Sequence, residues 1–268
     1  MSGLAHLQPV RYLFIDGGYL REAYGRFARA WFTDEADKAN RELMFQQITV
    51  GMRKTFYYDC KNDIQRSDET NETFRERQQK QEEQFNKIQS VIGCHVQLGT
   101  LAGEGARRRQ KEVDILLTVD MMNHAIRQNM SHAYLLAGDR DFRPVVKSLV
   151  DMGIFVIVRA DVRDSAPDLI RAADGFEEIK FSHYYGWTPE LIKTKYPVPE
   201  TTAGTRPPEL PLLRKGYAGK QAMLIYQNGN RVRSYFPDGQ TLRDCDRIDR
   251  LLTYVQLEFG EFTDNDSV

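Results

Sequence analysis

Carboxylates follow two apolar runs of this sequence, at the point where each run ends. Asp16 closes the run "RYLFID", and Asp139 and Asp141 follow "HAYLLAG". A single Asp after a strand is most often a turn former or a helix N-cap. Asp141 is open to that interpretation, because it precedes the helix-like stretch "FRPVVKSLV". Aspartates at the ends of two strands favour a shared site instead, since open sheets place their sites there.

A further carboxylate, Asp114, stands at the start of the helix-like segment "VDILLTVDMMNHAI". The partial positive charge at a helix N-terminus favours an anion in this position. Asp120 lies six residues further on, so a helix would turn it onto another face than Asp114. Asp120 is therefore the weaker candidate of the two.

Several ionised aspartates can share a small volume only when a cation compensates their charge. Hard carboxylate oxygens suit Mg²⁺ or Mn²⁺. Such an ion holds a phosphate and lowers the pKa of a bound water that attacks it. The pattern therefore predicts metal-dependent hydrolysis of a phosphodiester. The expected catalytic residues and metal ligands are Asp16, Asp114, Asp139 and Asp141, with Asp120 as an additional ligand.

The elements that must position these side chains alternate along the chain. Helix-length segments separate the strand-like runs 10–16, 55–59, 95–101, 132–138 and 154–161. This alternation is typical of a parallel sheet with helices on both faces. Ligands of such sheets bind outside the carboxyl ends of the strands, where the strand order reverses. If the first and fourth of these strands are neighbours there, the carboxylates that follow them converge.

The composition changes from Pro197, where "PVPETTAGTRPPELP" is typical of a linker. Beyond it, "QAMLIYQNGNRVRSYF" alternates apolar and polar residues around Asn228-Gly229, which is a hairpin signal. We therefore predict three parts: an α/β domain over 1–190, a Pro-rich linker over 191–211, and a small β-rich domain over 212–268.

Charge and cysteine content limit the classes of partner. The formal net charge is −1, so contact with nucleic acid has to be local. The three cysteines form no zinc-site or disulfide spacing, and no apolar run approaches 18 residues. We expect a cytoplasmic protein with reduced thiols and no membrane contact. A homo-oligomer is possible.

A basic cluster, "GARRRQK", precedes Asp114. It could hold the phosphates of a bound nucleic acid, and Arg140, between two aspartates, could do the same. A solvated basic loop, or pairing of Arg140 with the aspartates, explains these residues as well. The candidate nucleic-acid-binding residues are Arg107, Arg108, Arg109, Lys111 and Arg140.

Several motifs occur together in one order: "FIDGGYL", "YYD", "VQLGTL", "KEVDILLTVDMM" and "LLAGDRDFRPVVKSLVDMGIFVIV". In this the chain resembles the NYN domain family, a branch of the PIN-like nuclease superfamily, and within it the LabA-like group. The resemblance covers about residues 10 to 182. It implies a PIN-like three-layer α/β/α fold and an acidic cluster that binds Mg²⁺ or Mn²⁺ to cleave RNA. Carried over by position, the cluster is Asp16, Asp114, Asp139 and Asp141, with Asp120 and Lys111 as accessory members.

Two residues depart from the family's pattern and keep another class of function open. Tyr19 stands where many members have Asn, and Glu112 replaces a common glycine. The alternative to a ribonuclease is therefore a non-catalytic RNA-binding or regulatory protein of the same family. A phosphatase with Asp16 as nucleophile is a third, weaker interpretation. Its general acid would be an Asp two residues later, and that position is Gly18, which has no acidic group.

Overall fold

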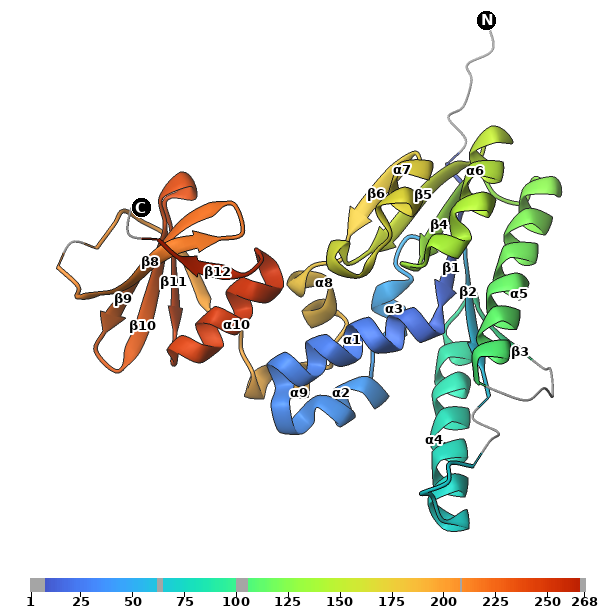
Figure 1. The fold of residues 1–268 in the computed structure, drawn as a ribbon, viewed down its shortest axis with the longest axis horizontal. Coiled ribbons are helices and arrows are strands. Elements are labelled where there is room, and N and C mark those ends of the chain that lie inside the picture. The colour runs from blue at the N-terminus through green and yellow to red at the C-terminus, as the bar shows by residue number, and fades with distance from the viewer. Residues whose placement is uncertain (1–7, 62–64, 100–105, 208, 266–268) are drawn as a thin grey trace, which may run out of the picture. The chain divides into compact units, whose positions relative to one another are not determined.

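The computed structural model describes residues 8–61, 65–99, 106–207 and 209–265, apart from the side chains of 106–111 (Figure 1). The described chain forms two compact units. The first comprises residues 1–23 and 44–179, and the second comprises residues 24–43 and 180–268. Across the described ranges, no helix is both long and apolar enough to cross a membrane.

A six-stranded sheet forms the centre of the first unit, with the order β3-β2-β1-β4-β5-β6. All of its neighbouring strands are parallel. This confirms the predicted central parallel sheet. The strands are β1 (Arg11–Asp16), β2 (Lys54–Cys60), β3 (Cys94–Gly99), β4 (His132–Leu136), β5 (Phe155–Ala160) and β6 (Gly175–Glu178).

Helices cover both faces of this sheet, as the alternation of elements predicts. On one face, apolar residues of α5 and α6 pack with Phe14 of β1 and Leu135 of β4 in a buried cluster. On the other face, the Phe85 ring of α4 lies 6.3 Å from the Tyr57 ring of β2. The helices are α1 (Gly17–Phe32), of which 17–23 belong to this unit, α3 (Phe45–Ile48), α4 (Asn71–Ser90), α5 (Ala106–Ile126), α6 (Arg143–Asp151) and α7 (Pro167–Ala172).

The spacing of apolar residues in α5 determines how this helix lies on the sheet. Val113, Leu117, Met121 and Ala125 recur every four residues and are all buried. Such a stripe lies on one side of a helix and packs against a core. Asp114 neighbours this stripe and is only partly exposed. The apolar spacing therefore holds the carboxylate near the sheet. The prediction that Asp114 stands at a helix N-terminus was wrong, because α5 begins at Ala106, about two turns earlier.

The second unit contains an antiparallel sheet of six strands, in the order β12-β8-β9-β10-β11-β7. Its strands are β7 (Glu200–Ala203), β8 (Leu212–Ala218), β9 (Gln221–Asn228), β10 (Arg231–Phe236), β11 (Thr241–Cys245) and β12 (Phe262–Asp264). Gly229 has a φ of +58° in the turn between β9 and β10, which confirms the predicted hairpin. The helices of this unit are α2 (Ala36–Arg41), α8 (Phe181–Gly186), α9 (Glu190–Lys195) and α10 (Ile248–Glu258), besides the end of α1.

Regular structure also occurs within 191–211, the stretch predicted to be a linker. Most of α9 and the whole of β7 lie there, and Thr201 and Thr202 of β7 pair with β11. β-branched residues favour such an extended, paired conformation. The division into three parts at residues 190 and 211 stays a prediction.

Candidate active site

The strand order of the first unit reverses between β1 and β4. The chain runs from β1 outward to β2 and β3, and then returns to β4 on the other side of β1. Ile15 pairs with Leu136, so Asp16 and the residues that follow β4 emerge at the same edge of the sheet. This is the position at which open α/β sheets bind their ligands.

Asp16 is held at the N-terminus of α1. Its side chain is 8% exposed, and its Oδ1 accepts a hydrogen bond from the Tyr19 backbone N–H at 3.1 Å. Burial raises the pKa of Asp16, although the backbone N–H groups of Tyr19 and Gly18 lower it. A Cβ atom at Gly17 would lie 2.5 Å from Tyr57 Cζ, so only glycine lets α1 begin directly after the strand.

Asp139 and Asp141 occupy the connection between β4 and α6. Asp139 caps the short 3₁₀ helix Arg140–Phe142, because its Oδ1 accepts from the Asp141 backbone N–H at 2.9 Å. The capping role thus falls to Asp139, and the exposed Asp141 caps neither this helix nor α6. A Cβ at Gly138 would lie 2.3 Å from the Asp164 carbonyl oxygen, so the glycine of "AGDRDF" is required by close packing.

Asp114 of α5 shows that the carboxylates lie close enough to influence one another. The pKa of Asp114 is raised to about 7, chiefly by burial and then by the negative charges of Asp16, Asp139 and Asp141, in that order of effect. Among the side chains that the structure describes, none of these four carboxylates forms a salt bridge, and no three His, Cys, Asp or Glu are arranged to hold a metal ion. The four aspartates therefore share one electrostatic field without forming a ready-made three-ligand cage.

Asp120 is engaged elsewhere. Its Oδ2 accepts a hydrogen bond from the Tyr58 hydroxyl at 3.1 Å, and its charge contributes to the raised pKa of Tyr58. It is not among the carboxylates that shift the pKa of Asp114. The fold thus separates Asp120 from the four aspartates, as the helical spacing indicates.

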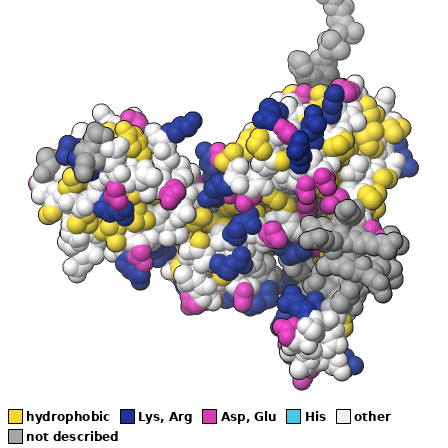
Figure 2. Space-filling model, in the orientation of Figure 1, with side chains coloured by type: hydrophobic (Ala, Val, Ile, Leu, Met, Phe, Trp, Pro, Cys, Tyr) yellow, Lys and Arg dark blue, Asp and Glu magenta, His cyan; other side chains and the backbone are white. Residues whose placement is uncertain are grey.

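The predicted basic residues are only partly located. Arg140 Nη2 lies 2.9 Å from Asp168 Oδ2, so this exposed arginine pairs with α7. Acidic and basic side chains are interspersed on the face shown in Figure 2. The predicted cluster in the first turns of α5 has side chains outside the described residues: Arg107, Arg108, Arg109 and Lys111.

Tyr19 has a packing role beside the site. Its hydroxyl accepts a hydrogen bond from the Asp161 backbone N–H at 2.8 Å, and its ring lies so close to Gly138 that a Cβ there would meet Tyr19 Cε2 at 2.6 Å. Tyr19 therefore ties the start of α1 to the loops that follow β4 and β5.

Sequence reasoning missed a buried ionic network at the end of β2, the strand next to β1. Asp59 is 2% exposed and accepts hydrogen bonds from the Tyr57 hydroxyl at 3.0 Å and the Cys60 backbone N–H at 2.7 Å. Arg21 of α1 forms a salt bridge with Asp59, and its charge also lowers the pKa of Asp16. The motif "YYD" at a strand end was the available signal.

Arginine pairing distinguishes the aspartates at this edge. Asp59 lies at the end of β2 and Asp161 follows β5; both are buried. Asp59 pairs with Arg21, and Asp161 pairs with Arg163. Such pairs neutralise a buried charge and explain these two aspartates as structural residues. Asp16, Asp114, Asp139 and Asp141 lack such an arginine partner among the described residues.

Comparison with known proteins identifies the family to which the sequence is similar. The model of the NYN domain matches residues 14–180 of the chain. The crystal structure of a protein of unknown function from Vibrio parahaemolyticus is similar at 18% sequence identity and a TM-score of 0.45, over 66% of this chain and 96% of that chain. No curated protein matches the chain.

Proposed function

The chain belongs to the NYN domain family, and on this basis we propose that it is a divalent-metal-dependent ribonuclease whose catalytic residues are Asp16, Asp114, Asp139 and Asp141. NYN domains are generally nucleases with a PIN-like fold. The observation that supports the proposal is the raised pKa of Asp114 at the switch point of the sheet. Burial is its largest cause, and the charges of Asp16, Asp139 and Asp141, which lack arginine partners among the described residues, add to it. Membership of the LabA-like group stays a prediction.

The donor set fits Mg²⁺ or Mn²⁺ in chemical type. All four side chains offer carboxylate oxygens, and Mg²⁺ commonly uses only one or two protein carboxylates and keeps several waters. A site of this kind does not require the three-ligand cage that the described side chains lack. When bound, the ion would polarise the scissile phosphate and lower the pKa of an attacking water.

The chain's own residues supply position and charge. Backbone N–H groups hold one carboxylate oxygen of Asp16 and one of Asp139, so both side chains are oriented before a ligand arrives. Asp114, whose pKa is raised to about 7, can take up or release a proton near neutral pH. Asp141 stands exposed beside Asp139, where it can orient water.

The phosphate contacts are part of the same proposal. A cluster of aspartates repels a phosphodiester, so neighbouring basic side chains have to offset this charge. We expect Arg107, Arg108, Arg109 and Lys111 to do so from the first turns of α5. Arg140 would exchange its exposed pair with Asp168 for a phosphate.

The test is incubation with labelled single-stranded RNA, structured RNA and single-stranded DNA, each with Mn²⁺, Mg²⁺ or a chelator. Asp139→Asn and Asp151→Asn are run in parallel, because Asp151 is an exposed aspartate at the end of α6 away from the site. We expect metal-dependent RNA cleavage that Asp139→Asn abolishes and Asp151→Asn retains. Cleavage by Asp139→Asn at the wild-type rate would contradict the site.

A non-catalytic RNA-binding protein is the second candidate. It is supported by Tyr19, which stands where many members of the family have Asn and whose hydroxyl is engaged by the Asp161 backbone N–H. RNA binding without cleavage in both metals, unchanged by Asp139→Asn, would select it.

A further inference from the structure

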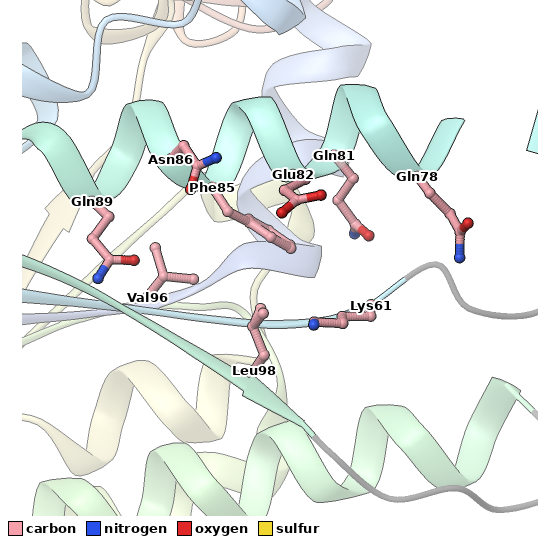
Figure 3. A pocket seen from close by; sticks show the side chains of 9 residues that line it. All are labelled: Lys61, Gln78, Gln81, Glu82, Phe85, Asn86, Gln89, Val96 and Leu98. Atoms are coloured by element: carbon pink, nitrogen blue, oxygen red, sulfur yellow. The ribbon is translucent and has the colours of Figure 1, made fainter. Parts of the chain in front are cut away.

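A groove of about 370 Å³ lies in the first unit between α4 and the edge strand β3 (Figure 3). Its volume is in the range of small-ligand sites. Apolar side chains form part of the lining, and carboxamides form much of the rest. The lining residues are Lys61, Gln78, Gln81, Glu82, Phe85, Asn86, Gln89, Val96 and Leu98.

The face of α4 that lines the groove adjoins the stripe that packs on the sheet: Phe85 and Ile88 are buried, whereas Glu82, Asn86 and Gln89 are exposed. Positions 78, 81, 82, 85 and 89 follow the spacing of one helical face. Only Phe85 among them is hydrophobic, and three are glutamines. Val96 and Leu98 of β3 also line the groove.

The carboxamides are available for a ligand. Gln81 Nε2 donates a hydrogen bond to the Cys60 carbonyl oxygen at 3.0 Å and is anchored. Within the described part of the chain, Gln78, Asn86 and Gln89 have no hydrogen-bond partner. Each free carboxamide offers both donors and an acceptor without a net charge. This chemistry suits a neutral planar group whose edge carries donors and acceptors.

One end of the groove opens toward the edge of the sheet that carries the aspartates. Lys61 directly follows β2, and Figure 3 shows it with Gln78 and Gln81 at the opposite end from Gln89 and Val96. β3 lies two strands from β1, which is about 10 Å at the usual strand spacing. The groove and α4 lie on the opposite face of the sheet from α5 and Asp114, so a strand bound at the aspartates would pass over the carboxyl edge of the sheet to reach the groove.

We propose that this groove binds an unpaired nucleobase of the RNA strand that is cleaved at the four aspartates, an inference that rests on the proposed function. Asn and Gln side chains read the hydrogen-bonding edges of bases, and single-stranded RNA is recognised through such edges. The apolar floor of Phe85, Val96 and Leu98 accepts the face of the base. Lys61 contacts the adjoining phosphate.

An extended peptide added to β3 is the competing occupant. The lining favours the base, because the unpartnered polar groups are side chains of α4, whereas strand addition relies on the backbone of the edge strand. A site for phosphate alone would present more than the single lysine of this lining.

The test compares the double variant Gln78→Ala/Gln89→Ala with Gln79→Ala. Gln79 is an exposed glutamine of the same helix whose Nε2 donates to Glu83 at 3.0 Å, so it is a matched control outside the groove. We measure kcat and KM on unstructured RNA oligonucleotides of different base composition. The double variant is expected to raise KM about tenfold through the loss of two hydrogen bonds, with kcat within about twofold and base preference reduced. Gln79→Ala should match the wild type.

A second arm uses the four nucleoside monophosphates as probes, observed by NMR. This measurement shows whether the groove binds a free nucleotide or only a base that is part of an RNA strand. It does not depend on cleavage. If the wild type cleaves RNA and the double variant has the same KM and base preference, the groove is not a base-binding site. The proposed ribonuclease activity would be unaffected by that result. If no RNA is cleaved, nucleotide binding that the double variant loses would still support a base site. Binding of a short Val/Thr-rich peptide, with no nucleotide binding, would assign the groove to protein.

Discussion

At the scale of residues, the aspartates of the first unit divide by what compensates their charge. Asp59 and Asp161 have arginine partners, whereas Asp114 is surrounded by other carboxylates. Asp16 is buried and Asp114 half-buried, whereas Asp139 and Asp141 are exposed, and we proposed that these four, which lack arginine partners among the described residues, form the catalytic site. The following predictions test this division.

Asp114→Asn should stabilise the metal-free protein at high pH. The folded-state pKa of Asp114 is about 7, above the ordinary value of 3.8, so the stability that it contributes is present below about pH 4 and is lost as the pH rises through 7. The full displacement is worth about 4 kcal/mol, and solvent screening reduces it to about 1–2 kcal/mol. Urea denaturation in a chelator at pH 4 and pH 8 should show a gain for the variant at pH 8 only. An equal gain at both values would contradict the raised pKa.

Asp139→Asn should lower metal-dependent cleavage by at least about 100-fold while the melting temperature stays equal or rises, because the substitution relieves repulsion between like charges. Mg²⁺ or Mn²⁺ should raise the melting temperature of the wild type, since a ligand that binds only the folded state stabilises it. This increase should be smaller in the variant. Scanning calorimetry with and without each ion checks both expectations, and an identical increase in both proteins would remove Asp139 from the ligands.

Arg21→Met should destabilise the protein by about 2–3 kcal/mol, because it leaves the buried Asp59 carboxylate without its cation. The effect is below that of a fully buried pair, since the Arg21 side chain is 44% exposed. The double variant Arg21→Met/Asp59→Asn should recover part of the loss. A urea-denaturation cycle of the four proteins measures the coupling, and additive effects would show that the pair contributes nothing.

At the scale of elements, the connection between β4 and α6 depends on close packing at Gly138. Gly138→Ala would force a Cβ against the Asp164 carbonyl oxygen and the Tyr19 ring, so the loop has to shift and carry Asp139 with it. We expect a loss of about 2 kcal/mol and a loss of cleavage. Gly186→Ala is the control, because nothing lies within 4 Å of a Cβ there. Unchanged cleavage and stability in Gly138→Ala would contradict this tight loop.

At the scale of the whole molecule, the second unit joins segments that are distant in the sequence. Tyr254 of α10 packs on Phe181 and Trp31, with ring centroids 4.8 and 6.3 Å away. Arg250 lies over the Trp31 ring at 4.7 Å. Residues 24–43 therefore fold with the C-terminal part of the chain, and not only with the domain predicted to end at residue 190.

Truncation after residue 190 should consequently lower the melting temperature and expose apolar surface to a hydrophobic dye, because Trp31 and Phe181 lose Tyr254. Trp31→Ala in the full chain should produce part of the same loss. A truncated protein that melts at the temperature of the full chain would instead support the domain boundary predicted from the sequence.

The order of elements and the aspartates at strand ends are local properties, and the sequence by itself determined them. Apolar runs ending in Asp16 and "GDRD", helix-length segments between them and the turn at Asn228-Gly229 are readable because strand, helix and turn preferences act over a few residues. The convergence of the carboxylates required only one further condition, that β1 and β4 are neighbours, and the topology meets it.

The tertiary structure alone decided which charges are paired and where the chain divides. The Arg21–Asp59 contact, the separation of Asp120 by Tyr58 and the packing of Trp31 with α10 all join residues distant in the sequence. The groove beside Gln78 and Gln89 is formed by side chains of α4 together with Val96 and Leu98 of β3. Such pairings depend on burial and on distances in three dimensions, which no local pattern of residue types contains.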